Sequence, residues 1–488
     1  MTDAPLAPHP DPAAGSAAPS ALADRDGVLA ELSAHVSRAW ASFEHPRPVE
    51  PAPDADLVRR LGRGLPDVGD DLSVALEDAA HVLDSSVSTA RPLFLAYVPS
   101  SALETGVLAS ALSSAYDANL ATSAGTADLL DRQAVHWLAE FLGYPAAEGH
   151  FTSGGQTSNF TGLLAAREHA RPGSREHGVT PGSAAVYASE EAHHSVVRAV
   201  EAAGLGRRAV RWVPTDDQRR MRPADLEALV RADLEAGVVP VAVVATAGTT
   251  LTGTVDPLGE IAAVCERHGV WLHVDGAYGI PAAATASHGH LFAGLARADS
   301  VTVDAHKWLG MPKSCSALLV RHHGVLRATF GHEEHYMLHE GDTGNPVDST
   351  FEYSRPLRAL RFWLSMRVHG AARFRAWLEG TLEVTRTFVD AVRAHPEFEL
   401  RHDPMLTTVC FRHLPPTGEG ERPLSGGALD RHHVALAQAL QHDGRVFLAP
   451  AELDGVTVLR ACFTNFRTDA ASAAGVLDVI SEVAASLR

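Results

Sequence analysis

Short β-branched runs alternate with helical segments from about Ser101 to Gly370, and this alternation constrains the fold more than any other feature of the sequence. The run VVPVAVVATAG, residues 238–248, suits a strand that is buried on both faces. The stretches ERHGVWLHVDGAYG (266–279) and ADSVTVDAHKW (298–308) each contain another strand, and the segment PLGEIAAVCERHG has helical spacing. We therefore predict an α/β fold with a mainly parallel sheet and helices on both sides.

The rest of the chain indicates four parts. Residues 1–24 are rich in Ala and Pro and are expected to form a disordered tail, and DGVLAELSAHVSRAW opens a predicted N-terminal helical arm over residues 25–100. Residues 101–370 form the predicted large domain. Residues 371–488 mix helical segments with strand runs such as MLTTVCFRHL and VTVLRACFTN, so we predict a smaller α+β domain there.

Charge and cysteine content exclude several classes of partner. The 488 residues carry a formal net charge of -18, which disfavours binding to nucleic acid or to anionic membranes. The four cysteines lie far apart without a C-x-x-C pair, which favours reduced thiols in a cytoplasmic protein. No secretory leader and no apolar stretch of transmembrane length is visible. We expect a cytoplasmic enzyme that acts on a small molecule.

Three predicted strands are each followed by a residue with useful chemistry. Thr246, Asp275 and Lys307 come at or just after their carboxyl ends, where an α/β sheet binds its ligands. A lysine, a carboxylate and hydroxyls at one sheet edge suit pyridoxal phosphate, an aldehyde with a basic ring nitrogen and a phosphate. A single Asp at a strand end is more often a turn or cap residue, so the combination carries the interpretation.

The stretch FTSGGQTSNFTGLLAAR places two glycines immediately before an apolar helix. Free backbone N–H groups and the helix dipole make such a terminus a site for a phosphate, which glycine lets approach closely. The alternative is an ordinary helix cap after a glycine turn. Asp275 and Lys307 further along the chain favour phosphate binding.

Lysine is almost absent, because only Lys307 and Lys313 occur among the 41 basic residues. GC-rich coding would replace solvated lysines by arginine at little cost. A lysine that must lose its proton to act as a nucleophile resists such replacement, since guanidinium stays charged. This argument favours a functional Lys307; Lys313 has no assigned role and is expected to be a loop or surface cation.

Several motifs together resemble the group II pyridoxal-phosphate-dependent amino acid decarboxylases, a family that includes the aromatic amino acid, glutamate, 2,4-diaminobutyrate and cysteine-sulfinate decarboxylases. The resemblance runs from about Pro92 to the C-terminus and implies the aspartate aminotransferase (type I) fold. It rests on the motifs HVDGAYG, DAHKW, TSGGQTSN, SEEAHHSVVRA, SRPLRALRFWLSMRVHG and LRACFTNFRTD.

The resemblance implies roles for individual residues. Lys307 is similar to the lysine that forms the internal aldimine, and Asp275 to the aspartate that pairs with the pyridine nitrogen. His193, chosen over His194, resembles the histidine that stacks on the ring. Ala277 is expected beneath the ring and Thr246 near its substituents, whereas the residues expected around the phosphate are Gly155, Gln156, His306 and Ser354. Ser354 would come from the second subunit of an obligate homodimer.

The polar loop FGHEEHYMLHEGDTGNP, residues 330–346, is interpreted as an active-site lid. The resemblance implies that Tyr336 of this loop protonates the substrate carbon after carbon dioxide leaves. His193 is the alternative proton donor for this step. Relatives with phenylalanine at this position tend to be aldehyde synthases, so tyrosine favours simple decarboxylation. A metal site at His332, His335 and His339 is the disfavoured alternative, because the spacing H-E-x-x-H is absent.

The predicted activity is decarboxylation of an L-amino acid to its amine and carbon dioxide, through the Lys307 aldimine and a quinonoid intermediate. The alternatives are a decarboxylation-dependent aldehyde synthase, an aminotransferase and a non-catalytic homologue. Val98 and Ser123 stand where aromatic residues line the pocket of many relatives, which weakens an aromatic substrate. The sequence does not identify the amino acid.

Overall fold

The computed structural model describes residues 24–44, 54–121, 125–332, 345–416 and 422–487. Its first unit contains three helices, α1 (Arg25–Ser42), α2 (Ala55–Leu61) and α3 (Leu72–Asp84). Each begins at an aspartate, Asp24, Asp54 or Asp71, whose side chain accepts a hydrogen bond from a backbone N–H of the first turn. The expected helix DGVLAELSAHVSRAW lies within α1. The predicted tail at residues 1–23 lies outside the described residues.

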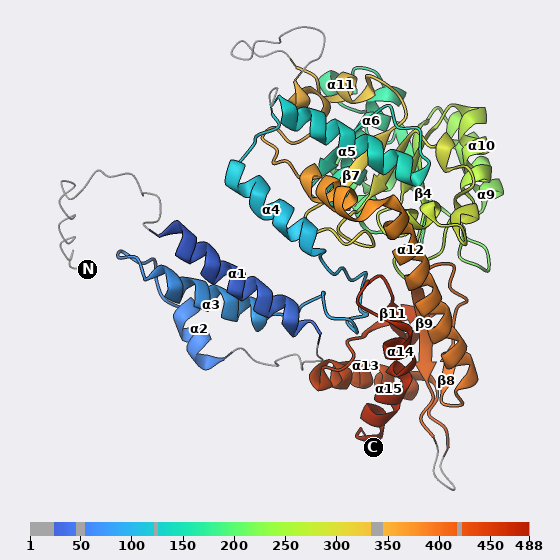
Figure 1. Ribbon diagram of the computed structural model, residues 1–488. Coiled ribbons are helices and arrows are strands. Elements are labelled where there is room, and N and C mark those ends of the chain that lie inside the picture. The colour runs from blue at the N-terminus through green and yellow to red at the C-terminus, as the bar shows by residue number, and fades with distance from the viewer. Residues whose placement is uncertain (1–23, 45–53, 122–124, 333–344, 417–421, 488) are drawn as a thin grey trace, which may run out of the picture. The chain divides into compact units, whose positions relative to one another are not determined.

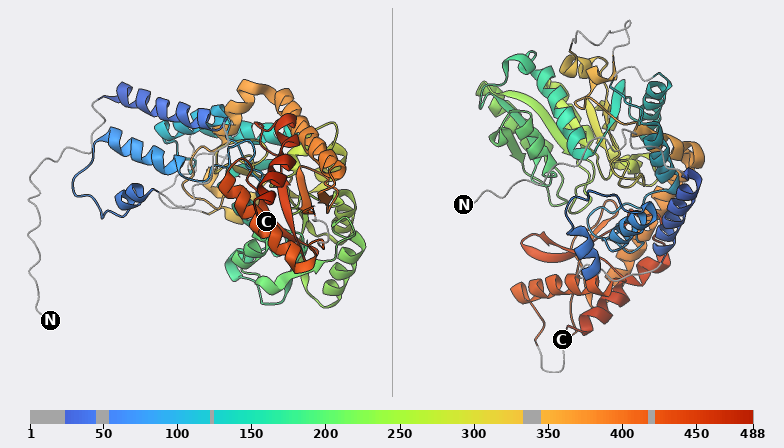
Figure 2. Two further views of the ribbon diagram at one scale, coloured as in Figure 1. Left: turned by 90° about the horizontal axis from the view of Figure 1, so that it is seen from below. Right: turned by 90° about the vertical axis from the view of Figure 1, so that its left-hand side faces the viewer.

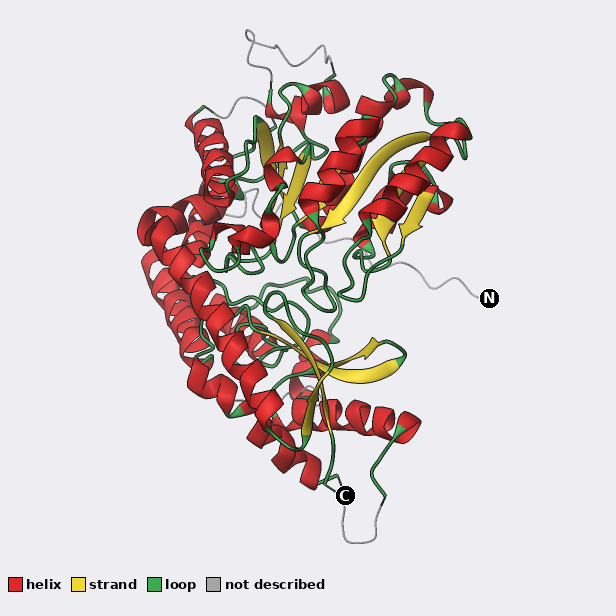
Figure 3. Cartoon of the chain, turned by 90° about the vertical axis from the view of Figure 1, so that its right-hand side faces the viewer, coloured by secondary structure: helices red, strands yellow, loops and turns green. Residues whose placement is uncertain are grey.

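Residues from Ser88 onward form a second unit, which is built on a sheet of seven strands in the described chain. The sheet order is β1-β7-β6-β5-β4-β2-β3, and Figure 3 shows these strands apart from the smaller sheet. Strands β2 to β6 are parallel, whereas β7 runs antiparallel to both β1 and β6. The strands are β1 (Glu148–Thr152), β2 (Ala184–Ser189), β3 (Val210–Val213), β4 (Val239–Thr246), β5 (Trp271–Asp275), β6 (Ser300–Val303) and β7 (Ser316–Val320).

Helices cover both faces of this sheet. Alternate residues of β4 contribute to two separate apolar clusters, because side chains of a strand point to opposite faces. Ala242 and Val244 pack with α6 (Gly155–Ala170) and α8 (Ser195–Ala202). Val243 and Ala245 belong to the cluster that includes α5 (Thr126–Leu142), α9 (Pro223–Glu235) and α10 (Leu258–His268).

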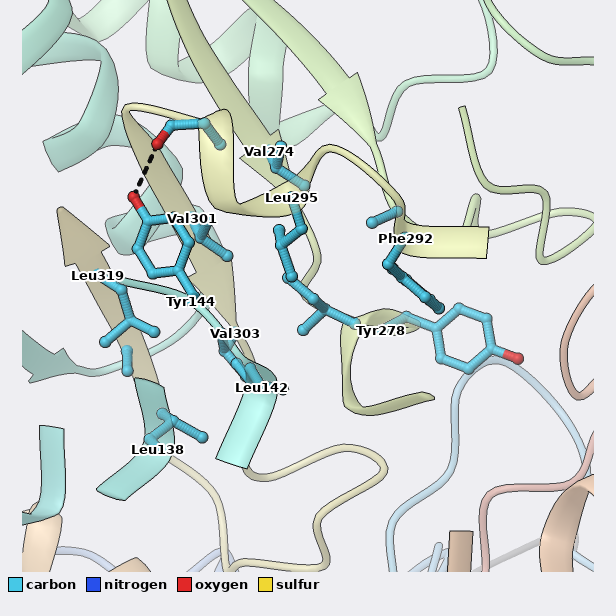
Figure 4. Packing of buried hydrophobic residues seen from close by; sticks show 14 of the residues in the cluster. Leu138, Leu142, Tyr144, Val274, Tyr278, Phe292, Leu295, Val301, Val303 and Leu319 are labelled. Atoms are coloured by element: carbon cyan, nitrogen blue, oxygen red, sulfur yellow. Dashed lines mark hydrogen bonds between the residues drawn. The ribbon is translucent and has the colours of Figure 1, made fainter. Parts of the chain in front are cut away.

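The second of these clusters also receives side chains from the segments between the strands. Figure 4 shows Val274 of β5 beside Leu295 and Phe292, and it shows the Tyr144 hydroxyl, which donates to the Ala298 carbonyl oxygen at 3.1 Å. This bond satisfies the one polar group that Tyr144 brings into the apolar interior. The remaining elements of this part of the chain are α4 (Glu104–Tyr116), α7 (Ser174–His177), α11 (Val325–Phe330) and the 3-10 turns η1 (Arg207–Ala209), η2 (Ile280–Ala284), η3 (Gly289–Phe292), η4 (Leu295–Arg297) and η6 (Pro346–Ser349).

The C-terminal part contains an antiparallel sheet of order β10-β11-β9-β8. Its strands and helices are β8 (Phe398–Leu400), β9 (Thr408–His413), β10 (Ala449–Leu453), β11 (Val456–Cys462), α12 (Ala359–Ala394), α13 (Gly426–Asp443), α14 (Ala470–Ala474) and α15 (Val476–Ala485). Helix α12 contacts α4 and α5 and also β8, β9 and α14, and Figure 2 shows its long orange ribbon from two further directions. Its backbone leaves the helical region at Gly370 (φ 74°), where we predicted the boundary between the two domains.

The fold predicted from the sequence is confirmed as α/β with a mostly parallel sheet and a smaller α+β part. The three expected strands are β4, β5 and β6, and they are neighbours in the sheet. The end of the predicted arm lies with the second unit, since the Leu95 N–H donates to the Phe447 carbonyl oxygen and the Leu95 carbonyl oxygen accepts from the N–H of Cys462 in β11. No helix in the described ranges is long and apolar enough to cross a membrane.

Candidate active site

The parallel register of the three central strands brings their carboxyl ends together. Thr246 of β4 is paired with Asp275 of β5, and Asp275 with Thr302 of β6, shortly before Lys307. A pocket opens at this edge. Most of the predicted site residues line it, namely Gly155, Gln156, His193, Thr246, Asp275, Ala277 and Lys307.

Lys307 lies at the pocket wall beside a carboxylate that we did not predict. Its Nζ atom is 3.0 Å from Oδ2 of Asp304, which is almost fully buried. Burial raises the pKa of Asp304, but the Lys307 cation and His306 outweigh it and hold that pKa below its usual value. Asp304 therefore stays ionised and fixes the lysine amine at the end of the pocket.

Asp275 is held from two directions. Asn159 Nδ2 donates to its Oδ2 atom at 2.8 Å, and the Ala277 backbone N–H donates to Oδ1 at 3.2 Å. Both Asn159 and Asp275 are buried. These two hydrogen bonds fix the orientation of the carboxylate, so the site offers an acceptor of defined position for a ring N–H group.

His193 follows β2 and lines the same pocket. The Ser195 backbone N–H donates to its Nδ1 atom at 3.2 Å, which leaves the ring proton on Nε2 when the ring is neutral. Burial of the ring at the pocket wall lowers the pKa of His193, although Asp275 opposes the shift. The neutral ring with its proton on Nε2 is therefore the favoured state.

The donor and acceptor set fits pyridoxal phosphate. The buried Thr246 hydroxyl faces the site region without a hydrogen-bond partner among the described residues, as does Oδ1 of Asp304. Helix α6 begins at Gly155, where an added Cβ would come within 2.9 Å of the Asp304 carboxylate oxygens. An amine, a carboxylate, an orphaned hydroxyl and an open helix N-terminus are the groups that the aldehyde, ring nitrogen and phosphate of this cofactor require.

Three predicted residues are not part of this lining. His306 lies behind it, with Nδ1 2.9 Å from the Cys315 carbonyl oxygen and Nε2 3.7 Å from Asp304. Ser354 is exposed and accepts a hydrogen bond from Asn119 Nδ2 at 3.3 Å. Tyr336 lies outside the described residues. The roles of all three stay predictions.

The structure places Lys313 but describes only one of the three histidines of the disfavoured metal site, His332. His335 and His339 lie outside the described residues, and within the described ranges no group of three His, Cys, Asp or Glu side chains could hold a metal ion. Lys313 is exposed, as we expected of a surface cation.

Sequence reasoning missed Asn159, Asp304 and Asp256, although Asn159 and Asp304 lie in motifs quoted above and Asp256 directly precedes the helical segment PLGEIAAVCERHG. Asn159 follows Gly155 by one helical turn, which is a signal that it faces the same pocket. The fully buried Asp256 accepts hydrogen bonds from the backbone N–H groups of Thr246 and Met221 at 2.8 and 2.7 Å, so it fixes the end of β4. Burial raises the pKa of Asp256 to about 6.

Comparisons with known proteins point to one family. The model of the pyridoxal-dependent decarboxylase conserved domain matches residues 55–414. The chain is 32% identical to an aromatic-L-amino-acid decarboxylase of Bacillus atrophaeus, over 86% of this chain and 88% of the relative. It is also 32% identical to a cysteine sulfinic acid decarboxylase of Mus musculus, over 75% of this chain and 76% of the relative. A crystal structure of Oryza sativa TDC with PLP and tryptamine matches 95% of this chain and 98% of its own, with a TM-score of 0.87 and 26% identity.

Proposed function

This chain belongs to the pyridoxal-dependent decarboxylase family and is a PLP-dependent amino acid decarboxylase, and from that premise we propose that Lys307 binds the cofactor aldehyde and that the products are an amine and carbon dioxide. One observation carries the proposal. The Lys307 amine, the Asp275 carboxylate and the partnerless Thr246 hydroxyl converge on one pocket at the edge of the parallel sheet.

We assign different pocket residues to the ring nitrogen, the ring faces and the phosphate of PLP. PLP, when bound, supplies the electron sink for the bonding electrons that the departing carboxylate leaves behind. Asp275 would face the ring nitrogen, and His193 and Ala277 would lie on the two faces of the ring. Gly155 and Gln156, at the start of α6, would hold the phosphate, with His306 and Ser354 as further expected contacts.

Proton movements are assigned to three residues. Lys307 must present a neutral amine to act as a nucleophile, whereas the ionised Asp304 3.0 Å away stabilises the cationic amine and holds it in place at the pocket wall until the proton leaves. His193 carries a proton on Nε2 and is a proton donor at the pocket wall. Tyr336 is the donor that the sequence leads us to expect, with His193 as its alternative, and a tyrosine there would favour amine rather than aldehyde as the product.

We also propose that the active unit is a homodimer with shared sites. Leu108, Leu112 and Tyr116 are exposed by 58%, 50% and 80%, and their spacing puts them on one face of α4. Asn119, just beyond that helix, donates to the exposed Ser354. A second copy covering this apolar stripe would bury it and bring the segment that carries Ser354 against another subunit.

The attachment of PLP can be tested directly because the chain has only two lysines. Purified enzyme is loaded with PLP, reduced with borohydride and digested, and the modified peptide is identified by mass spectrometry. We expect the adduct on Lys307 in the wild type and in the matched control Lys313→Ala, and no adduct in Lys307→Ala. An adduct on Lys313 alone would contradict the assignment.

The activity test incubates the holoenzyme with the common L-amino acids and follows carbon dioxide, amine, aldehyde and hydrogen peroxide together. The proposal expects amine and carbon dioxide in equal amounts from at least one amino acid, without oxygen uptake. Aldehyde with peroxide would overturn the amine product in favour of an aldehyde synthase.

The shared site has its own test by subunit mixing. Lys307→Ala and Ser354→Glu, which would repel the phosphate, are each expected to be inactive as homodimers. If Ser354 acts in the partner's site, a mixed dimer regains one site with both residues intact, and activity returns on mixing. No recovery, despite mixed dimers on native mass spectrometry, would place Ser354 outside the shared site. Leu112→Glu should yield monomers in light scattering, whereas Leu234→Glu on the distant α9 should not.

A further inference from the structure

A line of buried polar side chains ends on Asp275. Trp271 Nε1 lies 2.8 Å from Ser300 Oγ, which lies 2.7 Å from His273 Nδ1. His273 Nε2 lies 3.1 Å from Asn159 Oδ1, and Asn159 Nδ2 lies 2.8 Å from Asp275 Oδ2. These residues come from β5, β6 and α6, and all five are at most 5% exposed.

The two ends of this line fix the direction of its hydrogen bonds. The Trp271 indole can only donate, and an ionised Asp275 can only accept. Burial lowers the pKa of His273 to about 4, against the opposing charge of Asp275, so its ring is neutral and carries one proton. That proton must be on Nε2, because Asn159 turns its NH2 group to Asp275 and its oxygen to the histidine.

The direction of the two hydrogen bonds in the middle of the line follows from this tautomer. With the proton on Nε2, His273 Nδ1 accepts from the Ser300 hydroxyl, whose oxygen in turn accepts from Trp271. Every donor along the line points toward Asp275, and each of these buried groups is satisfied. The opposite tautomer would place two acceptors face to face at Asn159.

Packing keeps the His273 ring in this position. An added Cβ at Gly162 of α6 would come within 2.8 Å of the ring atoms Cε1 and Nδ1. His273 itself is 0% exposed, so water has no access to replace its bonds. The ring therefore has one available orientation, with Nε2 toward Asn159.

We propose that His273 is a positioning residue that acts on the reaction through Asn159, by holding a hydrogen-bond donor on Asp275 Oδ2 and so fixing this carboxylate in the orientation that accepts the ring N–H of the cofactor. The inference rests on the proposed pairing of Asp275 with PLP. A carboxylate held in this orientation would keep one oxygen in place to accept the ring N–H, which favours the proton on the ring nitrogen. A protonated ring is the stronger electron sink.

The test uses PLP labelled with ¹⁵N at the ring and compares holoenzyme variants by NMR. His273→Leu keeps the volume but removes the donor, and the ¹⁵N signal should move toward that of unprotonated pyridine. His273→Gln keeps a donor at the Nε2 position and should restore most of the wild-type signal. His150→Leu is the matched control, because His150 is another buried histidine of the same sheet, without contact to this line.

Kinetics give a second readout. For His273→Leu we expect kcat to fall about 2- to 10-fold with KM changed less than about twofold, as for loss of a hydrogen bond between neutral groups. Ser300→Ala, a smaller change, should move the ¹⁵N signal in the same direction and keeps the proposal testable if His273→Leu does not fold.

The outcomes separate this inference from the function on which it rests. If Asp275→Asn leaves the ¹⁵N signal in place, the pairing of Asp275 with PLP fails. If Asp275→Asn moves the signal but neither His273→Leu nor Ser300→Ala does, the pairing stands and the role of His273 is refuted.

Discussion

Removing one partner of the buried Arg355–Asp131 ion pair should destabilise the enzyme strongly. Arg355 Nη1 and Nη2 donate to the two carboxylate oxygens of Asp131 at 3.3 and 3.1 Å. The two side chains are only 3% and 8% exposed. At 3.1 Å and an effective dielectric constant of about 20, their attraction is about 5 kcal/mol. Asp131→Asn leaves the guanidinium buried and without its counter-charge, so we expect a loss of about 3–5 kcal/mol.

The assay is urea unfolding at fixed protein and PLP concentrations, with the shift in midpoint converted through the common slope. The double variant Asp131→Leu with Arg355→Met should lose less than either single variant, since no charge is left buried. Glu383→Gln is the control, because it breaks the exposed Glu383–Arg386 pair of α12 and should shift the midpoint far less than Asp131→Asn does.

This pair also bears on the site, because Arg355 is the residue next to Ser354 and its ion pair holds the segment before α12 against Asp131 of α5. If Asp131→Asn costs no more than the exposed control, the charge is solvated and the reasoning from burial fails. If the double variant is as unstable as Asp131→Asn, packing rather than the charge explains the loss.

Three further predictions concern single side chains. Thr246→Val removes the partnerless buried hydroxyl and should weaken PLP binding about 5- to 20-fold in a fluorescence titration of the apoenzyme. The stability of the apoenzyme should be unchanged or higher. Unchanged PLP affinity would mean that this hydroxyl does not touch the cofactor. The pKa of Asp256 is raised to about 6, so this group costs the native state stability as pH rises from about 4 to 6. Relative to Asp256→Asn, the wild type should therefore lose about 2–3 kcal/mol over that window in urea unfolding, and parallel curves would refute the shift. Burial raises the pKa of Cys315 to about 12 and of Cys410 to about 11, so both should react with a disulfide reagent only on unfolding, a rate that absorbance measures.

The part of the site that follows from strand order was predictable from the sequence. Thr246, Asp275 and Lys307 end or follow three apolar runs, and parallel strands place such residues at one edge whatever the details of packing. His193 and Gly155 were predicted as site residues from sequence motifs rather than from hydrophobic periodicity. The structure brings both to the same pocket.

The supporting residues could not be predicted in this way. Asn159 reaches Asp275 across 116 positions of sequence, and the contact depends on how α6 packs over β5. His273 looks like an ordinary inward residue of a strand, because nothing local reveals that Ser300 and Asn159 lie on its two nitrogens. Long-range register decides such contacts, and a single sequence carries only its local part.

The two lysines differ in exposure, so a protease that cuts only after lysine should cut the native enzyme at the two positions with different rates. Lys313 lies exposed beyond the pocket, whereas the Lys307 side chain is 27% exposed and would be covered further by a bound cofactor. Native enzyme would first be cut after Lys313, and the cut after Lys307 would report an open pocket. The ratio of the fragment cut after Lys307 to the fragment cut after Lys313 would then measure cofactor occupancy without a spectrum or a substrate.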